Sequence, residues 1–349
     1  MSQPIPQVDI VVLNHNGKKF LDDCFNSIRE TTYTNYKVYL LDNASTDDDI
    51  AYTRQHYPEV NIIANPDNNG FCAAYNMAIR QTTGKYFLCL NNDVKVKPDW
   101  LEPLVQTAEA DERIGSLQCK MVSFFDEHEF EYAGSSGGML DVYGYPFLRG
   151  RLFQSIEKDH GQYDDVASVF WTCGAAMFIR RSVLEETGLF DDIIVHHMDE
   201  IDLCWRMHLA GYNCKVVPQS VILHYGGATI QSFSFKKMYW NHRNSLYTIM
   251  KNYGTRNAIT KTLAHIVMDY MAAANSMIQG KFVHARAIFA AHYWIVTHFF
   301  TILRNRAEVQ RKRKVGDAEI TQKMYPKSAA LLHFVSGVKT YSGLMERIK

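Results

Sequence analysis

The feature that most constrains the fold is a strict alternation of strand-like and helix-like segments along the first part of the chain. Runs of β-branched and aromatic residues with the length of buried strands lie at 8–13, 36–41, 60–64 and 86–90. Between them, apolar residues recur at helical spacing at 18–30, 50–57 and 71–82. Because each helix must cross from one strand to the next, this order predicts a mainly parallel α/β sheet with helices on both faces.

Each of these strands ends in asparagine, aspartate or both. The clearest case is 86–90, Tyr-Phe-Leu-Cys-Leu, which is followed at once by Asn91, Asn92 and Asp93. One such ending is ordinary turn chemistry. The carboxyl ends of parallel strands, however, meet at one edge of a sheet, where open α/β folds bind ligands. Four such endings at one edge therefore favour a polar site, and oxygen-rich side chains there suit a hard divalent cation that carries substrate phosphates.

The order of elements is harder to read beyond residue 98. Residues 123–165 are rich in glycine, tyrosine, aspartate and phenylalanine and lack clean periodicity, which indicates an irregular insertion or substrate-side loop. The last expected strand runs directly into His224. Helices are expected at 98–112, 182–186 and 199–211, and strands at 169–179, with a bend at Gly174, and at 215–223.

The C-terminal part differs in character. Residues 233–252 are aromatic and basic, and 259–303 are helical with apolar residues on nearly all sides. The uncharged run 288–303 is shorter than the roughly twenty residues that span a bilayer. A basic cluster follows at 304–314. Two interpretations stay open: a helix pair that lies in a membrane interface and is held by anionic lipid, or a helical hairpin that packs on the preceding domain or forms a dimer.

Composition narrows the class of protein. A chain of 349 residues with 47% hydrophobic content can bury one large core, or one core plus an appendage. The 37 basic and 37 acidic residues balance, which argues against a nucleic-acid partner. The N-terminus has neither a basic n-region nor an apolar h-region, so we expect no secretory signal and a cytoplasmic protein. Seven scattered cysteines without a C-x-x-C pair indicate thiols and not a disulfide frame or zinc site.

The polar strand ends belong to a set of short motifs. They are VVLNHNG at 11–17, LDNASTD at 41–47, NNGFCAAYN at 68–76, LNNDV at 90–94, GAAMFIR at 174–180 and DEIDLCWR at 199–206. In this order and spacing they resemble the family-2 inverting glycosyltransferases of the GT-A fold, especially the bacterial rhamnosyltransferase-like branch that builds surface polysaccharides. The resemblance implies a GT-A domain at 1–252, divided into a nucleotide-binding half at 1–115 and an acceptor and catalytic half at 116–252. A helical region at 253–349, which could associate with a membrane, would follow.

The resemblance also implies a donor site. Asp42 would accept a hydrogen bond from the ring N–H of a pyrimidine base, which an apolar residue cannot do. Asn14 and Asn16 would line the same pocket. Asn69 and Gly70 precede a helix N-terminus, where backbone N–H groups can face donor phosphate or sugar oxygens. Further residues of these motifs that are expected at the substrate site are Asn43, Ser45, Asn76, Asn91, Asn92, Gly174 and Trp205.

Metal binding and catalysis are assigned in the same way. Asp93 stands at the last carboxylate of the family's Asp-x-Asp motif, so it would bind Mg²⁺ or Mn²⁺ on the nucleotide diphosphate, and His224 would complete the metal shell. The first position of that motif is Asn91 here, which removes one charge. Inverting transfer also needs a base for the acceptor hydroxyl. The family has a Glu-Asp pair at this point, and the reversed order here puts Glu200 on the base position, with Asp199 as the alternative.

These assignments predict transfer of a sugar from a pyrimidine nucleotide sugar, dTDP-rhamnose or a UDP-sugar, to a hydroxyl of a glycan or lipid-linked glycan. The enzyme would lie in the cytoplasm, peripherally on the inner face of the cell membrane. Two other classes were weighed. A dinucleotide oxidoreductase is disfavoured because the first turn is Asn14-His15-Asn16-Gly17 and not Gly-x-Gly-x-x-Gly. A non-catalytic nucleotide-sugar-binding module fits the departure at Asn91.

Overall fold

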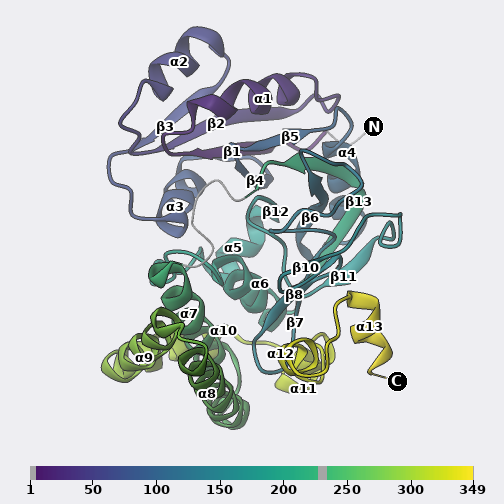
Figure 1. The fold of residues 1–349 in the computed structure, drawn as a ribbon. Helices are drawn as coiled ribbons and strands as arrows, with labels where there is room; N and C mark the ends of the chain where they lie inside the picture. Colours follow the sequence, from purple (N-terminus) through teal and green to yellow (C-terminus); the bar gives the residue numbers. More distant parts are fainter. Residues whose placement is uncertain (1–4, 227–233, 349) are drawn as a thin grey trace.

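The computed structural model describes residues 5–226 and 234–348. Its centre is a nine-stranded sheet in the order β11-β13-β6-β12-β4-β1-β2-β3, with β5 paired to β13 (Figure 1). The strands are β1 Val8–Asn14, β2 Tyr36–Asn43, β3 Asn61–Asn65, β4 Tyr86–Asn91, β5 Val94–Val96, β6 Ile114–Ser123, β11 Ala167–Val169, β12 Ala176–Arg180 and β13 Asn213–His224. The β4-β1-β2-β3 part is parallel throughout, as the alternation predicts.

Helices cover both faces of this sheet. In Figure 1, α1 and α2 lie on one face of the parallel part and α3 lies on the other. Helix α1 buries the apolar residues that recur at helical spacing, Leu21, Cys24, Phe25 and Ile28. The helices of the sheet domain are α1 Lys18–Arg29, α2 Asp49–His56, α3 Phe71–Gln81, α4 Leu101–Ala110, α5 Arg181–Thr187 and α6 Asp199–Leu209. All six were predicted, to within a few residues at their ends.

The predicted strand at 169–179 is wrong. Its two ends are separate strands: β11 is the edge strand beside β13, and β12 lies between β4 and β6. Residues between them leave the sheet, and the Trp171 indole N–H donates a hydrogen bond to the carbonyl of Met139 at 2.9 Å. An apolar run looks the same whether it forms one buried strand or two strands joined by a buried bend.

The 123–165 segment, predicted as irregular, contains a small four-stranded antiparallel sheet in the order β10-β9-β8-β7. Its strands are β7 Gly138–Leu140, β8 Pro146–Leu148, β9 Arg151–Leu152 and β10 Ser155–Ile156. Strands of two or three residues are too short to show an alternating pattern in sequence. Phe147 and Leu152 of this sheet form a separate small core with Tyr325, Ala329 and Leu344 from the C-terminal end of the chain.

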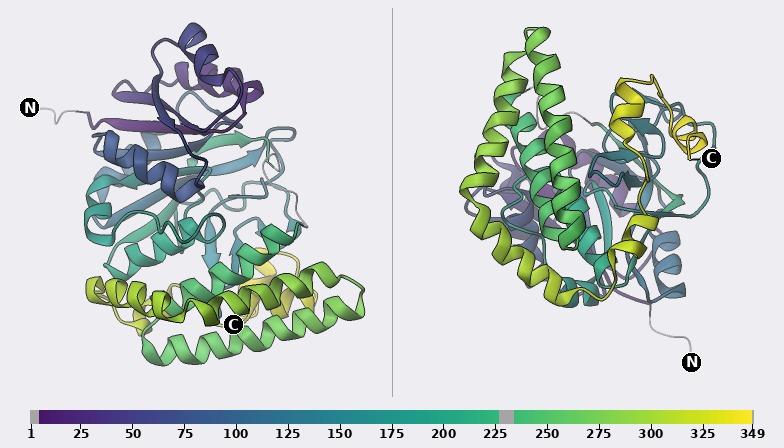
Figure 2. Two further views of the ribbon diagram at one scale, coloured as in Figure 1. Left: turned by 90° about the vertical axis from the view of Figure 1, so that its left-hand side faces the viewer. Right: turned by 90° about the horizontal axis from the view of Figure 1, so that it is seen from below.

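The C-terminal helices form a layer below the sheet domain (Figure 2). They are α7 Phe235–Asn252, α8 Thr255–Ile278, α9 Phe282–Thr297, α10 Phe299–Lys312, α11 Asp317–Gln322, α12 Ala329–Phe334 and α13 Tyr341–Glu346. Helix α7 packs against α8, α9 and α10. Asp269, the one acidic residue within α8, is buried and pairs with His242 of α7 and His292 of α9 at 2.8 and 2.9 Å. Within the described residues, no helix is long and apolar enough to span a membrane.

Candidate active site

Strand register brings the polar strand ends together. Asn14 at the end of β1 lies opposite Asp42 of β2, and the preceding Leu13 lies opposite Asn91 of β4. One strand further along, Asn43 of β2 pairs with Asn65 of β3. The four predicted endings therefore share one edge of the sheet, as parallel pairing requires.

Asn14 ties three loops of this edge to one another. Its side-chain N–H donates to Asp49 Oδ2 at 2.5 Å, and its oxygen accepts a hydrogen bond from Asn92 at 2.6 Å. Asn16 holds the β2–α2 loop: its backbone N–H donates to Ser45 Oγ at 3.0 Å, and its side-chain oxygen accepts from the Thr46 N–H at 2.7 Å. Asn14, Asn16, Asn92 and Ser45 thus build the floor of the predicted donor site.

Asp42 differs from its neighbours because half of its carboxylate lacks a partner. The side chain is buried, and Oδ2 accepts a hydrogen bond from the Ser45 N–H at 3.2 Å. Oδ1 is buried without a hydrogen-bond partner among the described residues. Buried acceptors are nearly always paired in folded proteins. A ligand N–H is the kind of donor that would satisfy this oxygen.

The side of the site toward β3 consists of asparagines and one glycine. Asn43 donates to Asn68 at 2.9 Å and accepts from Asn65 at 2.7 Å, and Asn65 also donates to Asn69 at 3.1 Å. Gly70 caps the N-terminus of α3 with a φ of +96°. A Cβ added there would lie 2.8 Å from Val195 Cγ1, so both the backbone angle and the close approach require glycine.

Asp93 and His224 lie together between β4 and β13, as the resemblance implied. His224 Nε2 is 3.1 Å from Asp93 Oδ1, and His224 Nδ1 is 3.1 Å from Glu131 Oε2. Burial acts to lower the pKa of His224, but hydrogen bonding to Asp93 and Glu131 outweighs burial and raises it to about 10. Asn91 is near the same ring, with its Nδ2 3.4 Å from His224 Nε2. Glu131 was not predicted, because it stands in the segment without periodicity.

Asp93 and His224 suit a divalent ion only if the substrate supplies further ligands. Among residues 5–226 and 234–348, no three histidine, cysteine, aspartate or glutamate side chains are arranged to hold a metal ion by themselves. Mg²⁺ in proteins is commonly held by one or two carboxylates together with substrate phosphates and water. The Asp93 carboxylate fits that kind of site, whereas His224, whose raised pKa favours its protonated form, could bind the ion only after losing a ring proton.

Asp199 and Glu200 occupy the first turn of α6, which the chain enters through an unusual backbone. His197 and Met198 have φ values of +63° and +67°, a conformation that costs free energy in residues other than glycine and that clusters at functional sites. Asp199 is buried and Glu200 is half-buried.

A helix N-terminus favours anions, but burial acts against the charged form of Asp199. Burial raises the pKa of Asp199 well above its usual range, and the adjacent Glu200 charge raises it further. The dipole of a helix N-terminus stabilises an anion by only about 0.3–1 kcal/mol at exposed positions, whereas full burial can shift a carboxyl pKa by several units. Burial therefore favours the protonated form of Asp199.

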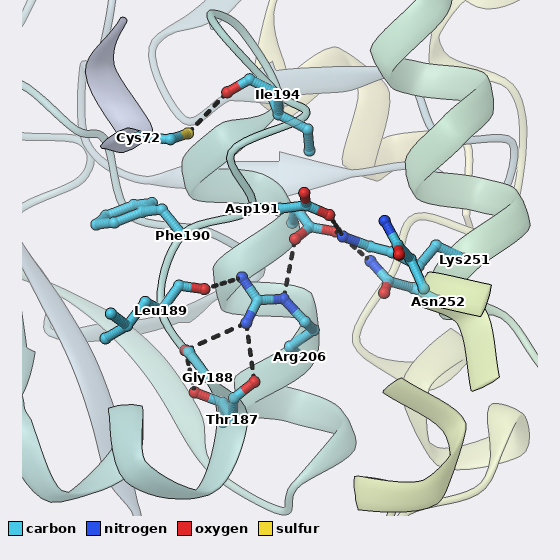
Figure 3. A network of polar contacts seen from close by, with 12 residues as sticks. Cys72, Thr187, Gly188, Leu189, Phe190, Asp191, Ile194, Arg206, Lys251 and Asn252 are labelled. Atoms are coloured by element: carbon cyan, nitrogen blue, oxygen red, sulfur yellow. Dashed lines mark hydrogen bonds and ion pairs between the residues drawn. The ribbon is translucent and has the colours of Figure 1, made fainter. Parts of the chain in front are cut away.

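A buried ionic network fixes the loop that leads into α6 (Figure 3). Arg206 donates to the carbonyls of the loop residues Thr187, Gly188 and Leu189 at 2.8–3.2 Å. Its Nε also binds Asp202 at 2.9 Å. Lys251 of α7 contacts both Asp202 and Asp191, at 2.8 and 2.5 Å. Asp202 and Arg206 are one helical turn apart, whereas Lys251 and Asp191 are distant in sequence and meet only in the folded chain.

Three predicted substrate residues make packing or hydrogen-bond contacts within the protein. Asn76 binds the loop before α6, donating to the carbonyl of Phe190 at 2.9 Å and accepting from its N–H at 3.0 Å. Trp205 is buried in the core, edge-on to Tyr253. A Cβ added at Gly174 would lie 2.8 Å from Phe71 Cζ. Direct substrate contact by these three stays a prediction.

Comparison with known proteins identifies the family of this chain. A family model described as Glycosyl transferase family 2 matches residues 9–188, just over half of the chain. The chain belongs to glycosyl transferase family 2. Rhamnosyltransferase WbbL of Escherichia coli K12 is 25% identical over 248 residues, covering 68% of this chain and 90% of that protein. An N-acetylglucosaminyl-diphospho-decaprenol L-rhamnosyltransferase of Mycobacterium tuberculosis is 25% identical over 232 residues, covering 62% and 75%. Both relatives confirm the resemblance to the rhamnosyltransferase-like branch.

Other relatives are matched over less than half of their own length. The chain spans 18% of the O-antigen biosynthesis protein RfbC of Myxococcus xanthus, at 27% identity over 243 residues, and 47% of an uncharacterized glycosyltransferase of Haemophilus influenzae. Among solved structures, GalNAc-T7 with UDP, GalNAc and Mn²⁺ matches 86% of this chain and 58% of its own, with a TM-score of 0.58 at 14% identity. A mannosyltransferase of Pyrobaculum calidifontis with GDP-Man and Mn²⁺ matches 83% and 87%, with a TM-score of 0.50 at 15% identity. These likenesses confirm the GT-A fold.

Proposed function

We propose that the protein is an inverting glycosyltransferase that moves a sugar from a pyrimidine nucleotide sugar to a hydroxyl of a glycan or lipid-linked glycan in surface polysaccharide synthesis. One observation carries the proposal. One sheet edge carries a buried Asp42 oxygen that lacks a partner within the described chain and the Asp93–His224 pair, and the loop leading into the acidic first turn of α6 contacts the start of α3 through Ile194 and Cys72. Relatives named as rhamnosyltransferases favour dTDP-rhamnose over a UDP-sugar as the donor.

Each group has a task in this reaction. Asp42 accepts the ring N–H of the base, and the N-terminus of α3 at Asn69 and Gly70 faces the diphosphate or the sugar. The Glu200 carboxylate takes the proton of the acceptor hydroxyl as that oxygen attacks the anomeric carbon from the side opposite the leaving diphosphate. Protonated Asp199 leaves Glu200 as the proton acceptor of the pair. Asp93 and His224 would hold Mg²⁺ or Mn²⁺, which supplies positive charge to the departing diphosphate.

Donor binding and turnover provide the direct test. A thermal-shift screen of dTDP-rhamnose and UDP-sugars, with and without Mg²⁺ or Mn²⁺, should show one donor that raises the melting temperature, because a ligand of the native state stabilises it. Transfer of that sugar to an acceptor should then be detected by mass spectrometry. Because Asn91 replaces a carboxylate, a non-catalytic nucleotide-sugar-binding module is the second candidate, and it would bind the donor without transferring the sugar.

Metal dependence is tested through Asp93. In wild-type protein, EDTA should abolish the thermal shift caused by donor and metal together, and excess Mg²⁺ or Mn²⁺ should restore it, because one carboxylate gives only modest affinity. Asp93→Ala should lose the metal-dependent part of the shift. Asp126→Ala, which removes a carboxylate from an exposed loop, is the matched control. Full transfer by Asp93→Ala in EDTA would rule out this role.

We also propose that α8–α10 bind the inner face of an anionic membrane, beside a lipid-linked acceptor. Two features support this partner. Between residues 255 and 312 the exposed charged side chains are basic except for Glu308: Arg256, Lys281, Arg286, Arg304, Arg311 and Lys312. The same helices expose large apolar side chains: Ile259, Leu263, Val267, Tyr270, Met271, Met277, Ile278, Phe282, Val283, Phe289, Tyr293, Val296, Phe299, Phe300 and Leu303. Apolar area with cationic residues is the composition that binds anionic lipid surfaces.

A further inference from the structure

A second polar cluster lies beside the active site on the small sheet and at the start of α7. Its centre is the ring of Tyr132, which is 45% exposed. The Arg151 guanidinium of β9 lies over this ring with its Cζ 4.0 Å from the centroid. Lys237, in the first turn of α7, approaches the same ring with its Nζ 5.9 Å from the centroid. We call Arg151 and Lys237, with Tyr132 between them, the cationic cluster.

Arg151 has donor capacity that the protein leaves unused. One guanidinium N–H donates to the carbonyl of Phe153 at 2.7 Å. The Nε atom is buried, and within the described part of the chain it has no hydrogen-bond partner. Leaving a charged donor buried and unpaired costs free energy, so such a group calls for an explanation. A bound anion would supply the missing acceptor.

Glu131, the acidic residue next to Tyr132 in the sequence, has other partners. It contacts His224 at 3.1 Å and accepts hydrogen bonds from the backbone N–H groups of Ala133 and Gly134 at 2.6 and 3.3 Å. Its charge is therefore used to hold His224 and the 131–134 turn. Among the described residues neither Arg151 nor Lys237 forms an ion pair with an acid, and the Glu131 charge only partly offsets the lowering of the Arg151 pKa by burial.

The cluster adjoins the active site through Glu131, which contacts His224, and it adjoins the helical layer through α7. His197, three residues before Glu200, is held to α7 by the Asn244 side chain, which donates to the His197 carbonyl at 3.0 Å. The donor phosphates are assigned to the α3 N-terminus and to Asp93, so the cluster lies next to the Asp93–His224 pair, and titration with saturating dTDP separates the two positions. Helix α7, which carries Lys237, packs against α8, α9 and α10, the helices with the exposed apolar surface.

We propose that the cationic cluster binds the diphosphate of a lipid-linked acceptor, so that the sugar attached to it reaches Glu200 while its lipid extends toward α8–α10. This inference rests on the proposed function. A diphosphate offers several acceptor oxygens and more than one negative charge, which matches a guanidinium fork and an ammonium presented side by side. Tyr132 contributes a flat exposed face that keeps the guanidinium oriented by stacking.

Farnesyl diphosphate, a short soluble lipid diphosphate, is the probe. Its affinity for the full-length protein is measured by calorimetry below its micelle concentration, so that no membrane takes part. Saturating dTDP is present to fill the donor's diphosphate position. Arg151→Gln and Lys237→Gln should each weaken binding about ten- to hundredfold, the loss expected for one charge-assisted hydrogen bond. Farnesyl phosphate, with less charge, should bind the wild type more weakly than the diphosphate.

Lys236→Gln is the matched control, since it removes the same charge from the neighbouring and more exposed position of α7. It should bind farnesyl diphosphate as the wild type does. Circular dichroism and melting temperature establish that each variant is folded, and Lys237→Gln on the helix surface keeps the test decisive if Arg151→Gln disturbs the small sheet. Folded Lys237→Gln with wild-type affinity would overturn the proposal, as would equal weakening by Lys236→Gln.

The nucleotide titration is read separately from the lipid titration. Each variant should bind dTDP with the affinity of the wild type, because the cluster lies outside the donor site. Wild-type protein that binds farnesyl diphosphate through Arg151 and Lys237 but binds neither dTDP nor UDP would refute the proposed glycosyl transfer while supporting the anion site.

Discussion

At the scale of single residues, Asp42 has the surroundings expected of a ligand-binding group: it is buried, and its Oδ1 has no hydrogen-bond partner among the described residues. Replacing it with alanine removes the buried acceptor that would pair with the base. We expect Asp42→Ala to weaken dTDP or UDP binding about tenfold or more, the cost of one charge-assisted hydrogen bond, with the fold retained. Calorimetric titration of the nucleotide measures this change.

Asp48→Ala is the control for that experiment. Asp48 stands in the same β2–α2 connection, but it is exposed and pairs with Lys18 on the surface. Its removal should leave nucleotide affinity unchanged, because surface ion pairs contribute little. Equal nucleotide binding by Asp42→Ala and the wild type would place the base pocket elsewhere.

Glu200 and Asp199 differ in burial, and this difference separates their roles. Loss of a general base costs about a hundredfold to ten-thousandfold in rate, so Glu200→Gln should lower turnover by that order without changing donor affinity. Asp199→Asn should have a smaller effect, because burial already keeps Asp199 protonated. Single-turnover rates with saturating donor measure both variants. If Asp199→Asn abolishes transfer while Glu200→Gln stays active, the two roles must be exchanged.

At the scale of elements, the ionic network between α6 and α7 determines where the catalytic turn lies. Lys251 is buried between Asp191 and Asp202, and these contacts hold α7 against the loop that leads to Asp199. Lys251→Met would leave both carboxylates without their ammonium partner. Breaking a buried ion pair costs about 3–5 kcal/mol, so we expect a loss of that size in the free energy of unfolding, measured by urea denaturation.

Lys314→Met provides the comparison for that measurement. Lys314 forms an ion pair of similar length with Glu186, but its side chain is 62% exposed, against 2% for Lys251. Its removal should cost about 0–1 kcal/mol. If the two variants lose similar amounts of the free energy of unfolding, burial does not determine how much an ion pair contributes to the stability of this protein.

At the scale of the whole molecule, the helical layer has an apolar and basic surface that suits an anionic membrane. Phe300 is 85% exposed on α10. If its ring enters the lipid, Phe300→Ser should lower the partition coefficient onto phosphatidylglycerol vesicles about tenfold, since a buried phenylalanine contributes about 1.5–3 kcal/mol. Vesicle flotation measures this coefficient.

Phe125→Ser is the control for membrane binding, because Phe125 is 78% exposed but lies in the sheet domain. It should float as the wild type does. Binding to phosphatidylglycerol should also exceed binding to phosphatidylcholine and weaken with salt. Wild-type protein that stays unbound at low salt would favour the other interpretation, a helical unit that packs or dimerises.

Sequence patterns predicted elements well where the pattern was long and regular. Apolar residues recur with strand or helix spacing within short stretches of sequence from β1 to β4 and in α1, α3 and α6. This local pattern is enough to predict those elements. Prediction failed at 169–179 and 123–165, where strands are short and their partners are distant. β11, for example, owes its existence to pairing with β13, more than forty residues later.

By itself, the sequence determined the parallel sheet and the polar edge, because backbone periodicity and strand-end chemistry are local, and the resemblance of its motifs to a family pointed to the candidate residues Asp42, Asp93, Asp199, Glu200 and His224. Tertiary structure alone decided how those residues meet. Asp93 and His224 are 131 positions apart, and only the pairing of β13 with β5 brings them into contact. Glu131, Lys251 and Arg151 gain their roles in the same way, since burial and charge pairing depend on neighbours in space. Burial of Asp199, which raises its pKa, is likewise a product of tertiary packing.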